Sequence, residues 1–273
     1  TETPVTVNLS ASTVNEDAAD TSYVFTATLS AASQGVTTIV TDKGTITIAD
    51  GQTTGTLTIA SNNTSDVYVD RSELTATITS ASGGNFEKIN VGTATAKATV
   101  TDTETPVTVN LSASTVNEDA SNTSYVFTAT LSAASQGDTI IVTDKGTIEI
   151  ADGETTGTLT IASNNTGDVY NDASELTATI TSASGGNFEK INVGTATAKA
   201  TVTDTETPVT VNLSASTVNE DASNTSYVFT ATLSAASQGD TIIVTDKGTI
   251  EIADGETTGT LTIASNNTGD VYN

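Results

Sequence analysis

Carboxylates are the side chains in this sequence with the greatest capacity for chemistry. The chain carries 33 Asp and Glu residues against 8 Lys and Arg, and it contains no His or Cys. Without imidazoles and thiols it offers little to zinc or copper, whereas carboxylates suit hard cations such as Ca²⁺. So few bases cannot neutralise phosphates, which excludes a nucleic-acid-binding protein.

The carboxylates recur with a period of 102 residues. The run Val-Thr-Asp-Thr-Glu-Thr-Pro at 100–106 returns at 202–208, and its second half opens the chain. A segment of about 100 residues can bury its own core as one domain. We therefore expect three modules: 1–102, 103–204 and an incomplete copy, 205–273.

Short segments that alternate apolar and polar residues predict strands between the acidic loops, and no segment predicts a helix. We expect an all-β fold of tandem immunoglobulin-like β-sandwich domains with about seven strands each. Phe86 follows a Gly-Gly-Asn turn and is expected to plug the end of the core. In the first copy the expected strands are 5–9, 23–29, 36–41, 45–48, 54–60, 74–78 and 93–101.

An up-and-down order of these strands would gather acidic loops at the end where the chain leaves the domain. Seven carboxylates of the first copy fall there, namely Glu16, Asp17, Asp20, Asp42, Asp66, Asp70 and Asp102. At ~5 Å and an effective dielectric of ~20, each close pair costs roughly 3 kcal/mol. Bound Ca²⁺ would remove that cost; a solvated acidic cluster without an ion is the alternative.

The segment between copies offers further ligands. Asp102 ends the last expected strand, Glu104 follows two residues later, and Pro106 holds Thr105 extended. Calcium bound by Asp102, Glu104 and the loop carboxylates would fix this linker. Glu87, beside Lys88, is expected at the opposite, nearly balanced end of the sandwich.

Several runs resemble the extender repeats of giant bacterial RTX adhesins, of the LapA-like biofilm and ice-adhesion types, and more distantly Calx-β sandwiches. They are Thr13-Val14-Asn15-Glu16-Asp17, Tyr23 to Ser30, Asp66-Val67-Tyr68-Val69-Asp70, Gly83-Gly84-Asn85-Phe86-Glu87 and Val100 to Thr103. The resemblance covers the whole module, although the glycine-rich calcium nonapeptides that name the RTX family are missing.

The resemblance implies a cell-surface spacer between a membrane-anchored end and a distal binding domain, stiffened by Ca²⁺. It maps calcium ligands onto Glu16, Asp17, Asp66, Asp70 and Asp102, and in the second copy onto Glu118, Asp119, Asp168, Asp172 and Asp204. The matching positions of the third copy are Glu220, Asp221 and Asp270, with Glu104 and Glu206 as linker ligands.

The first two copies differ at nine positions, and the third matches the second throughout its length. Copies this similar indicate that the protein needs length rather than a distinct binding surface on each domain. We expect neighbouring repeats of the same chain to be the partners, and a monomer rather than an oligomer. We expect no nucleic acid and no direct membrane contact, because no apolar run approaches the ~20 residues of a membrane span. No signal peptide is present, which indicates an internal piece of a longer chain.

The third copy stops at Asn273, before its last two expected strands. We expect a shortened segment; a filament completed by strand donation is the alternative. A carbohydrate- or cell-binding module is a further alternative, although only six Tyr and five Phe are present. We expect no enzyme, since only carboxylate or Ser/Lys chemistry is available, and outer-face threonines need no ice contact to explain them.

Overall fold

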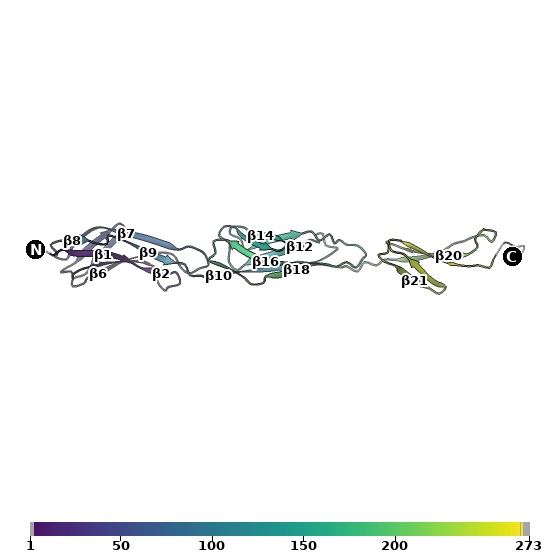
Figure 1. Cartoon of the computed structure of the whole chain (residues 1–273), viewed down its shortest axis with the longest axis horizontal. Helices are drawn as coiled ribbons and strands as arrows, with labels where there is room; N and C mark the ends of the chain where they lie inside the picture. The colour runs from purple at the N-terminus through teal and green to yellow at the C-terminus, as the bar shows by residue number, and fades with distance from the viewer. Residues whose placement is uncertain (1–2, 268, 270–273) are drawn as a thin grey trace. The chain divides into compact units, whose positions relative to one another are not determined.

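The computed structural model describes residues 3–267 and 269, and these fall into two compact units. Unit 1 contains residues 1–112, 127–159 and 178–198, and unit 2 contains residues 113–126, 160–177 and 199–273. These bounds do not follow the sequence repeats, so the repeats as separate domains stay a prediction. The first copy lies in unit 1 and runs from purple to blue in Figure 1.

The first sheet of this copy contains four strands in the order β6-β3-β1-β8. Strands β1, β3 and β6 pair antiparallel, and the short β8 joins the edge of β1 in parallel. Their bounds are β1 Val5–Ala11, β3 Tyr23–Leu29, β6 Thr54–Ile59 and β8 Ile89–Val91.

The second sheet contains five strands in the order β2-β9-β7-β4-β5. The three-residue strand β2 pairs in parallel with β9, so both strands end at the same edge of the sheet. The bounds are β2 Thr13–Asn15, β4 Thr37–Thr41, β5 Gly44–Ile48, β7 Ser72–Gly83 and β9 Thr95–Thr101.

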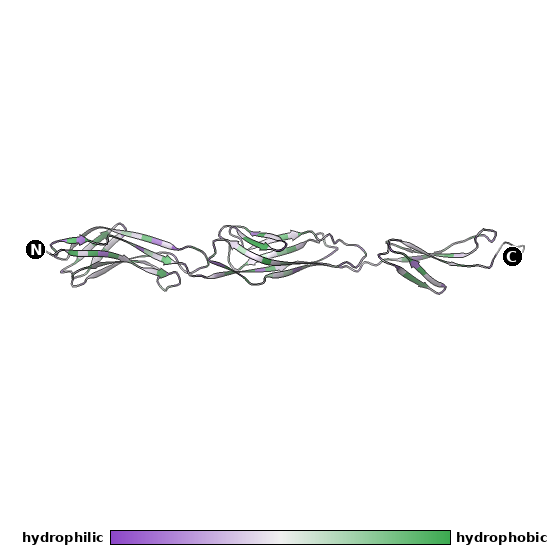
Figure 2. Ribbon diagram, in the orientation of Figure 1, coloured by the Kyte–Doolittle hydropathy of each residue, from purple (hydrophilic) through white to green (hydrophobic). Residues whose placement is uncertain are grey.

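Alternation along the strands builds the core between the two sheets. Hydrophobic and hydrophilic residues follow one another as green and purple bands on the ribbon (Figure 2). Inward residues are fully buried, among them Phe25 on β3, Ile39 on β4 and Val100 on β9. Phe86 packs half-buried against the edge of this core, as expected from its place after the turn.

The all-β sandwich is therefore confirmed, with nine strands in the first copy where seven were expected. The prediction missed β2 and β8, because each has only three residues and too few alternations to be recognised. No helix long and apolar enough to cross a membrane occurs in the part of the chain that the structure describes.

The second copy repeats the strands of the first at a distance of 102 residues. Its sheets have the orders β15-β12-β10-β17 and β11-β18-β16-β13-β14. The bounds are β10 Pro106–Ala113, β11 Thr115–Asn117, β12 Tyr125–Leu131, β13 Thr139–Thr143, β14 Gly146–Ile150, β15 Thr156–Ile161, β16 Ser174–Gly185, β17 Lys190–Val193 and β18 Thr197–Thr203.

The described part of the third copy forms a three-stranded sheet, β19-β20-β23, and a two-stranded sheet, β21-β22. Ala231, Ile250 and Ile252 are its buried core. The bounds are β19 Val211–Ala215, β20 Tyr227–Leu233, β21 Thr241–Thr245, β22 Gly248–Ile252 and β23 Thr258–Ile263.

The turn at the end of β16 has three consecutive residues with positive φ: Gly185 at 96°, Gly186 at 70° and Asn187 at 54°. A Cβ on Gly186 would lie 2.2 Å from Thr139 Oγ1 and 2.5 Å from the Phe188 ring. Only glycine fits both this backbone conformation and this space. The turn thereby sets where Phe188 and the following Glu189 lie.

We predict that Gly186→Ala lowers the free energy of unfolding by about 1–3 kcal/mol more than Gly153→Ala, because overpacking adds to backbone strain. Gly153 is the matched control, since its φ is 80° but a Cβ there would meet nothing within 4 Å. Urea titrations of the two variants test this. Equal decreases in the free energy of unfolding would show that the close contacts around Gly186 do not add to the cost of the substitution.

Candidate metal centre

Strand pairing brings the first two carboxylates of the candidate site together. Asp102 directly follows β9, and Glu16 directly follows its parallel partner β2. The Glu16 N–H extends the pairing by donating to Thr101 O at 3.0 Å. Both acids therefore stand at one edge of the second sheet, where β2 and β9 end.

Two more carboxylates come from the loop between β6 and β7. The buried Asn63 side chain supports this loop by donating to Asp70 O at 3.0 Å and to Ser72 Oγ at 3.2 Å. The Asp70 N–H donates to Asp102 Oδ1 at 3.3 Å, which joins the loop to the end of β9. One oxygen each of Glu16, Asp66 and Asp70 lies within 4.8 Å of the others.

A fifth carboxylate, Glu189, comes from the second copy. It lies between the glycine turn and β17, and it joins Glu16 and Asp102 in a second group whose oxygens also lie within 4.8 Å of one another. All five acids belong to unit 1. Glu16 is common to both groups, so the two copies contribute to one continuous cluster.

Linker backbone groups hold two of these carboxylates in place. The Thr103 N–H donates to Glu16 Oε1 at 3.3 Å, and the Thr105 N–H donates to Glu189 Oε2 at 2.5 Å. Glu104 pairs with Lys190. The linker thus holds one ligand candidate from each copy, Glu16 and Glu189, through the N–H groups of two of its residues.

Burial of Glu16 makes the cluster costly as it stands, although Asp66 and Asp70 are exposed. Glu16 is 2% exposed, and its Oε2 has no hydrogen-bond partner; Glu189 Oε1 and Thr103 Oγ1 are buried without partners as well. Within unit 1, no Lys or Arg forms an ion pair with any of the five acids in the described part of the chain. A buried carboxylate needs such a partner.

The same burial shifts proton affinities. Burial first, then the nearby Glu189, Asp70 and Asp66 charges, raise the pKa of Glu16, opposed by the hydrogen bond from Thr103 N–H. Burial, then the charges of Asp66 and Asp102, raise the pKa of Asp70. Both acids therefore favour a bound proton or a bound cation.

The residues present fit a hard divalent cation. All donors are oxygens, the chain has no His or Cys, and three buried oxygens lack partners. An open surface hollow of about 250 Å³ is lined by Asp102, Thr103 and Glu189, which gives solvent and ions access to these oxygens. The oxygens of Glu16, Asp66, Asp70, Asp102 and Glu189 are the ligand candidates.

A second cluster of the same kind lies in unit 2. It contains Glu118, which is 2% exposed with an unpartnered Oε2, together with Asp172 and Asp204. The Thr205 N–H donates to Glu118 Oε1 at 3.1 Å, and the Asp172 N–H donates to Asp204 Oδ1 at 3.0 Å. The arrangement at Asp102 therefore recurs at Asp204.

Other predicted ligands lie outside these groups, and their assignment stays a prediction. Glu104 pairs with Lys190, and Asp168 Oδ1 accepts the Tyr170 N–H at 2.6 Å. Asp42, expected at the acidic end, accepts the Thr77 N–H and pairs with Lys43. Asp270 lies outside the described residues. The remaining predicted ligands are exposed and belong to none of the groups; they are Asp17, Asp119, Glu206, Glu220 and Asp221.

The sequence reasoning missed Glu189. Its counterpart Glu87 was assigned to the opposite end of the sandwich, and there it is exposed. When two copies follow one another, the acidic end of one meets the opposite end of the next. The run Gly-Gly-Asn-Phe-Glu at 185–189 was the signal, because it places an acid directly after a turn.

Comparison with known proteins identifies the repeats. The family model described as LapA domain matches residues 3–103, 105–205 and 207–273. No curated protein matches the chain.

Similar solved structures include a tetra-tandem repeat in the extending region of a large adhesion protein, with a TM-score of 0.32, 16% identity, and coverage of 96% of this chain and 66% of that one. CBD12 from CALX1.2 has a TM-score of 0.30, 10% identity, and coverage of 71% of this chain and 99% of that one.

We predict that Glu16→Gln stabilises the metal-free protein increasingly as pH rises. A carboxylate whose pKa is higher in the folded state than in the unfolded state stabilises the fold fully at pH values below its unfolded-state pKa, near 4.5. This contribution to stability is lost as the pH rises towards the folded-state pKa. Glutamine mimics the protonated form, so the variant keeps that stability. Urea unfolding in chelator between pH 4 and 7 measures the difference; a difference that is flat or falls with pH contradicts the prediction.

Proposed function

Since the chain belongs to the LapA domain family and carries three of its repeats, we propose that it is an extender segment of a bacterial cell-surface adhesin. In this role it spaces a distal binding domain from the cell, and Ca²⁺ stiffens the connections between consecutive repeats. Residues 1–102, 103–204 and 205–273 are the proposed modules. Their partners are neighbouring repeats, and the protein acts outside the cell as a monomer without catalysis.

One observation supports this proposal above the others: Glu16 is shared by two carboxylate groups, and the second includes Glu189 of the next copy. A cation bound there would contact both copies at once. Its binding would therefore be coupled to the contact between them, since ligands that favour one arrangement shift the population towards it.

The chain's own residues would perform three tasks. Glu16 and Asp102 present oxygens from the sheet edge, and Asp66 and Asp70 do so from the loop that Asn63 supports. Thr103 and Thr105 orient Glu16 and Glu189 through their N–H groups. When bound, Ca²⁺ would supply the positive charge that balances these carboxylates.

Calcium is favoured over magnesium by the character of the donors. Several carboxylates from loops and strand ends converge here, and Ca²⁺ accepts 6–8 oxygen ligands in flexible geometry. Magnesium requires a near-octahedral shell and gives up its waters reluctantly. The sharing of Glu16 between two groups also permits two neighbouring ions.

We predict that Glu189→Gln weakens calcium binding at this site by roughly tenfold or more, because it removes one charged ligand. Glu87→Gln is the matched control, since the same residue in the same local sequence is exposed there. Isothermal titration calorimetry on the full chain measures both. Equal affinities in the two variants would remove Glu189 from the site.

We also predict that calcium raises the melting temperature and increases the maximum dimension seen by small-angle X-ray scattering. At a free concentration 100 times the dissociation constant, binding to the folded state alone adds about 2.7 kcal/mol per site. The protein is compared in EDTA and in excess Ca²⁺. If neither quantity changes, the calcium-dependent spacer is rejected.

A further inference from the structure

A tyrosine of the first copy reaches into the second copy beside the carboxylate cluster. Tyr68 stacks on Phe188, with ring centroids 5.4 Å apart and ring planes inclined by 22°. Its hydroxyl donates to Ala134 O at 2.6 Å. Both contacts lie within unit 1, and neither uses a carboxylate.

The backbone around Tyr68 is paired as well. The Val69 N–H donates to Asn187 O at 2.9 Å, and the Glu189 N–H donates to Val67 O at 3.0 Å, which makes an isolated antiparallel bridge. We call Val67–Val69 the tyrosine loop. The Asp66 carboxylate preorganises it by accepting the Tyr68 N–H at 2.6 Å.

The surface that receives the tyrosine loop is held by contacts within the second copy. The Gly185-Gly186-Asn187 turn exposes Asn187 O, and the Gln136 N–H donates to Gly186 O at 3.1 Å, which ties this turn to the segment carrying Ala134. We call Ala134, Asn187 and Phe188 the socket. Asn187 Nδ2 also donates to Gln136 Oε1 at 3.1 Å.

The copies differ in the burial of the socket phenylalanine and in the residue after the tyrosine. Phe188 is 9% exposed, whereas its counterpart Phe86, with no tyrosine stacked on it in the described chain, is only half-buried. Val69 becomes Asn171 in the second copy, although Tyr68 is retained as Tyr170. In the first copy the residue after the tyrosine contacts the socket through its backbone N–H, and such a contact does not depend on the identity of the side chain.

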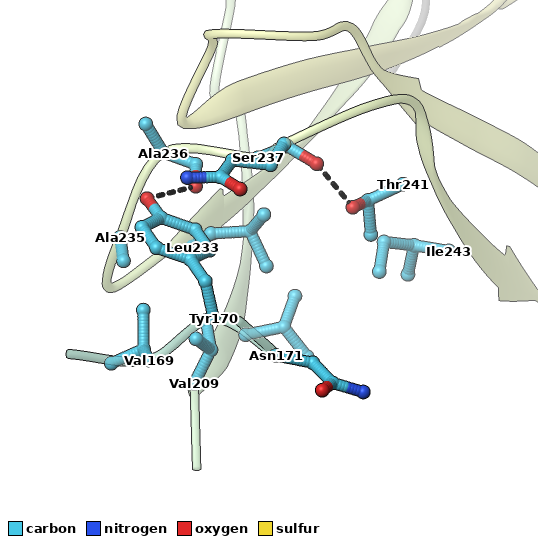
Figure 3. Close-up of a pocket in the computed structure, with 12 residues that line it drawn as sticks. Val169, Tyr170, Asn171, Val209, Leu233, Ala235, Ala236, Ser237, Thr241 and Ile243 are labelled. Atoms are coloured by element: carbon cyan, nitrogen blue, oxygen red, sulfur yellow. Dashed lines mark hydrogen bonds between the residues drawn. The ribbon is translucent and has the colours of Figure 1, made fainter. Parts of the chain in front are cut away.

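The hydroxyl contact recurs in unit 2. Tyr170 OH donates to Ala236 O at 2.8 Å, and Tyr170 lines a pocket together with Leu233, Ala235 and Val209 (Figure 3). The tyrosine of one copy thus reaches the same alanine carbonyl of the next copy in both places.

We infer that the tyrosine loop and the socket form an attachment between consecutive repeats that requires no metal. The contacts are an aromatic stack and hydrogen bonds between uncharged groups, so the repulsion among the acids does not act on them directly. Removing calcium would therefore release the carboxylate side of the connection and leave the tyrosine side in place. This inference does not depend on calcium binding at the cluster.

Distances between two spin labels test the attachment. The chain has no Cys, so Thr45→Cys and Thr147→Cys introduce two label sites, both exposed and equivalent in the two copies. Double electron–electron resonance is recorded on the full chain in EDTA. We expect one narrow distance distribution for the labelled parent and at least a twofold broader one for Tyr68→Ala or Phe188→Ala.

Two further variants separate the contributions. Tyr68→Phe keeps the stack and loses the hydroxyl contact, so an intermediate width is expected. Phe86→Ala is the matched control and should leave the width unchanged. Circular dichroism checks that each variant is folded.

The inference is overturned if the labelled parent in EDTA is as broad as Tyr68→Ala, or if Tyr68→Ala is as narrow as the parent. Calcium added to Tyr68→Ala narrows the distribution if the cluster forms a second attachment. If calcium does not narrow the distribution of Tyr68→Ala, the calcium proposal is contradicted. The tyrosine attachment is tested only by the widths in EDTA, so the two proposals can be rejected independently.

Discussion

An ionised carboxylate removed from water needs a compensating charge, and Glu16 meets four other acids instead. It is 2% exposed, and its Oε2 has no partner. The parallel pairing of β2 with β9 fixes this position, because it brings the residue after each strand to the same sheet edge. The fold thus holds the repulsive arrangement, and a cation would relieve it. A protein built for stability alone would gain by placing an uncharged residue at this position.

The linker is ordered by the same cluster. Thr103 and Thr105 donate backbone hydrogen bonds to Glu16 and Glu189, while Glu104 between them pairs with Lys190. The side chains of Thr103 and Thr105 therefore carry less of the specificity than the positions of their N–H groups do, whereas Glu104 acts through its side chain. An insertion of one residue here would misalign both hydrogen bonds at once. This explains physically why the spacing from Asp102 to Pro106 recurs unchanged in the second copy.

Much of the fold and part of the site follow from the sequence. Alternation identified the long strands such as β3 and β9, and the sandwich class with them. It could not find β2, whose pairing with β9 depends on residues more than 80 positions away in the chain. Clustering of Glu16, Asp66, Asp70 and Asp102 was foreseen, whereas Asp42 binds the Thr77 N–H instead. The roles of Glu189 and Tyr68 could not be predicted from the pattern of one repeat, because their partners belong to another copy.

The two ends of one copy are different, and this difference has a structural consequence. One end carries the acids and the tyrosine loop, and the other carries the glutamate and the socket. Such a contact is heterologous: it joins unlike surfaces and does not close on itself, so it can be repeated along a chain. The first two copies retain Glu16, Tyr68, Asp102 and their counterparts while differing at nine other positions. Only Thr38 and Thr47 of these positions lie in strands, and Val69 lies in the tyrosine loop itself. The connection therefore constrains its contact residues, while other positions in the loops at the ends of the copy vary.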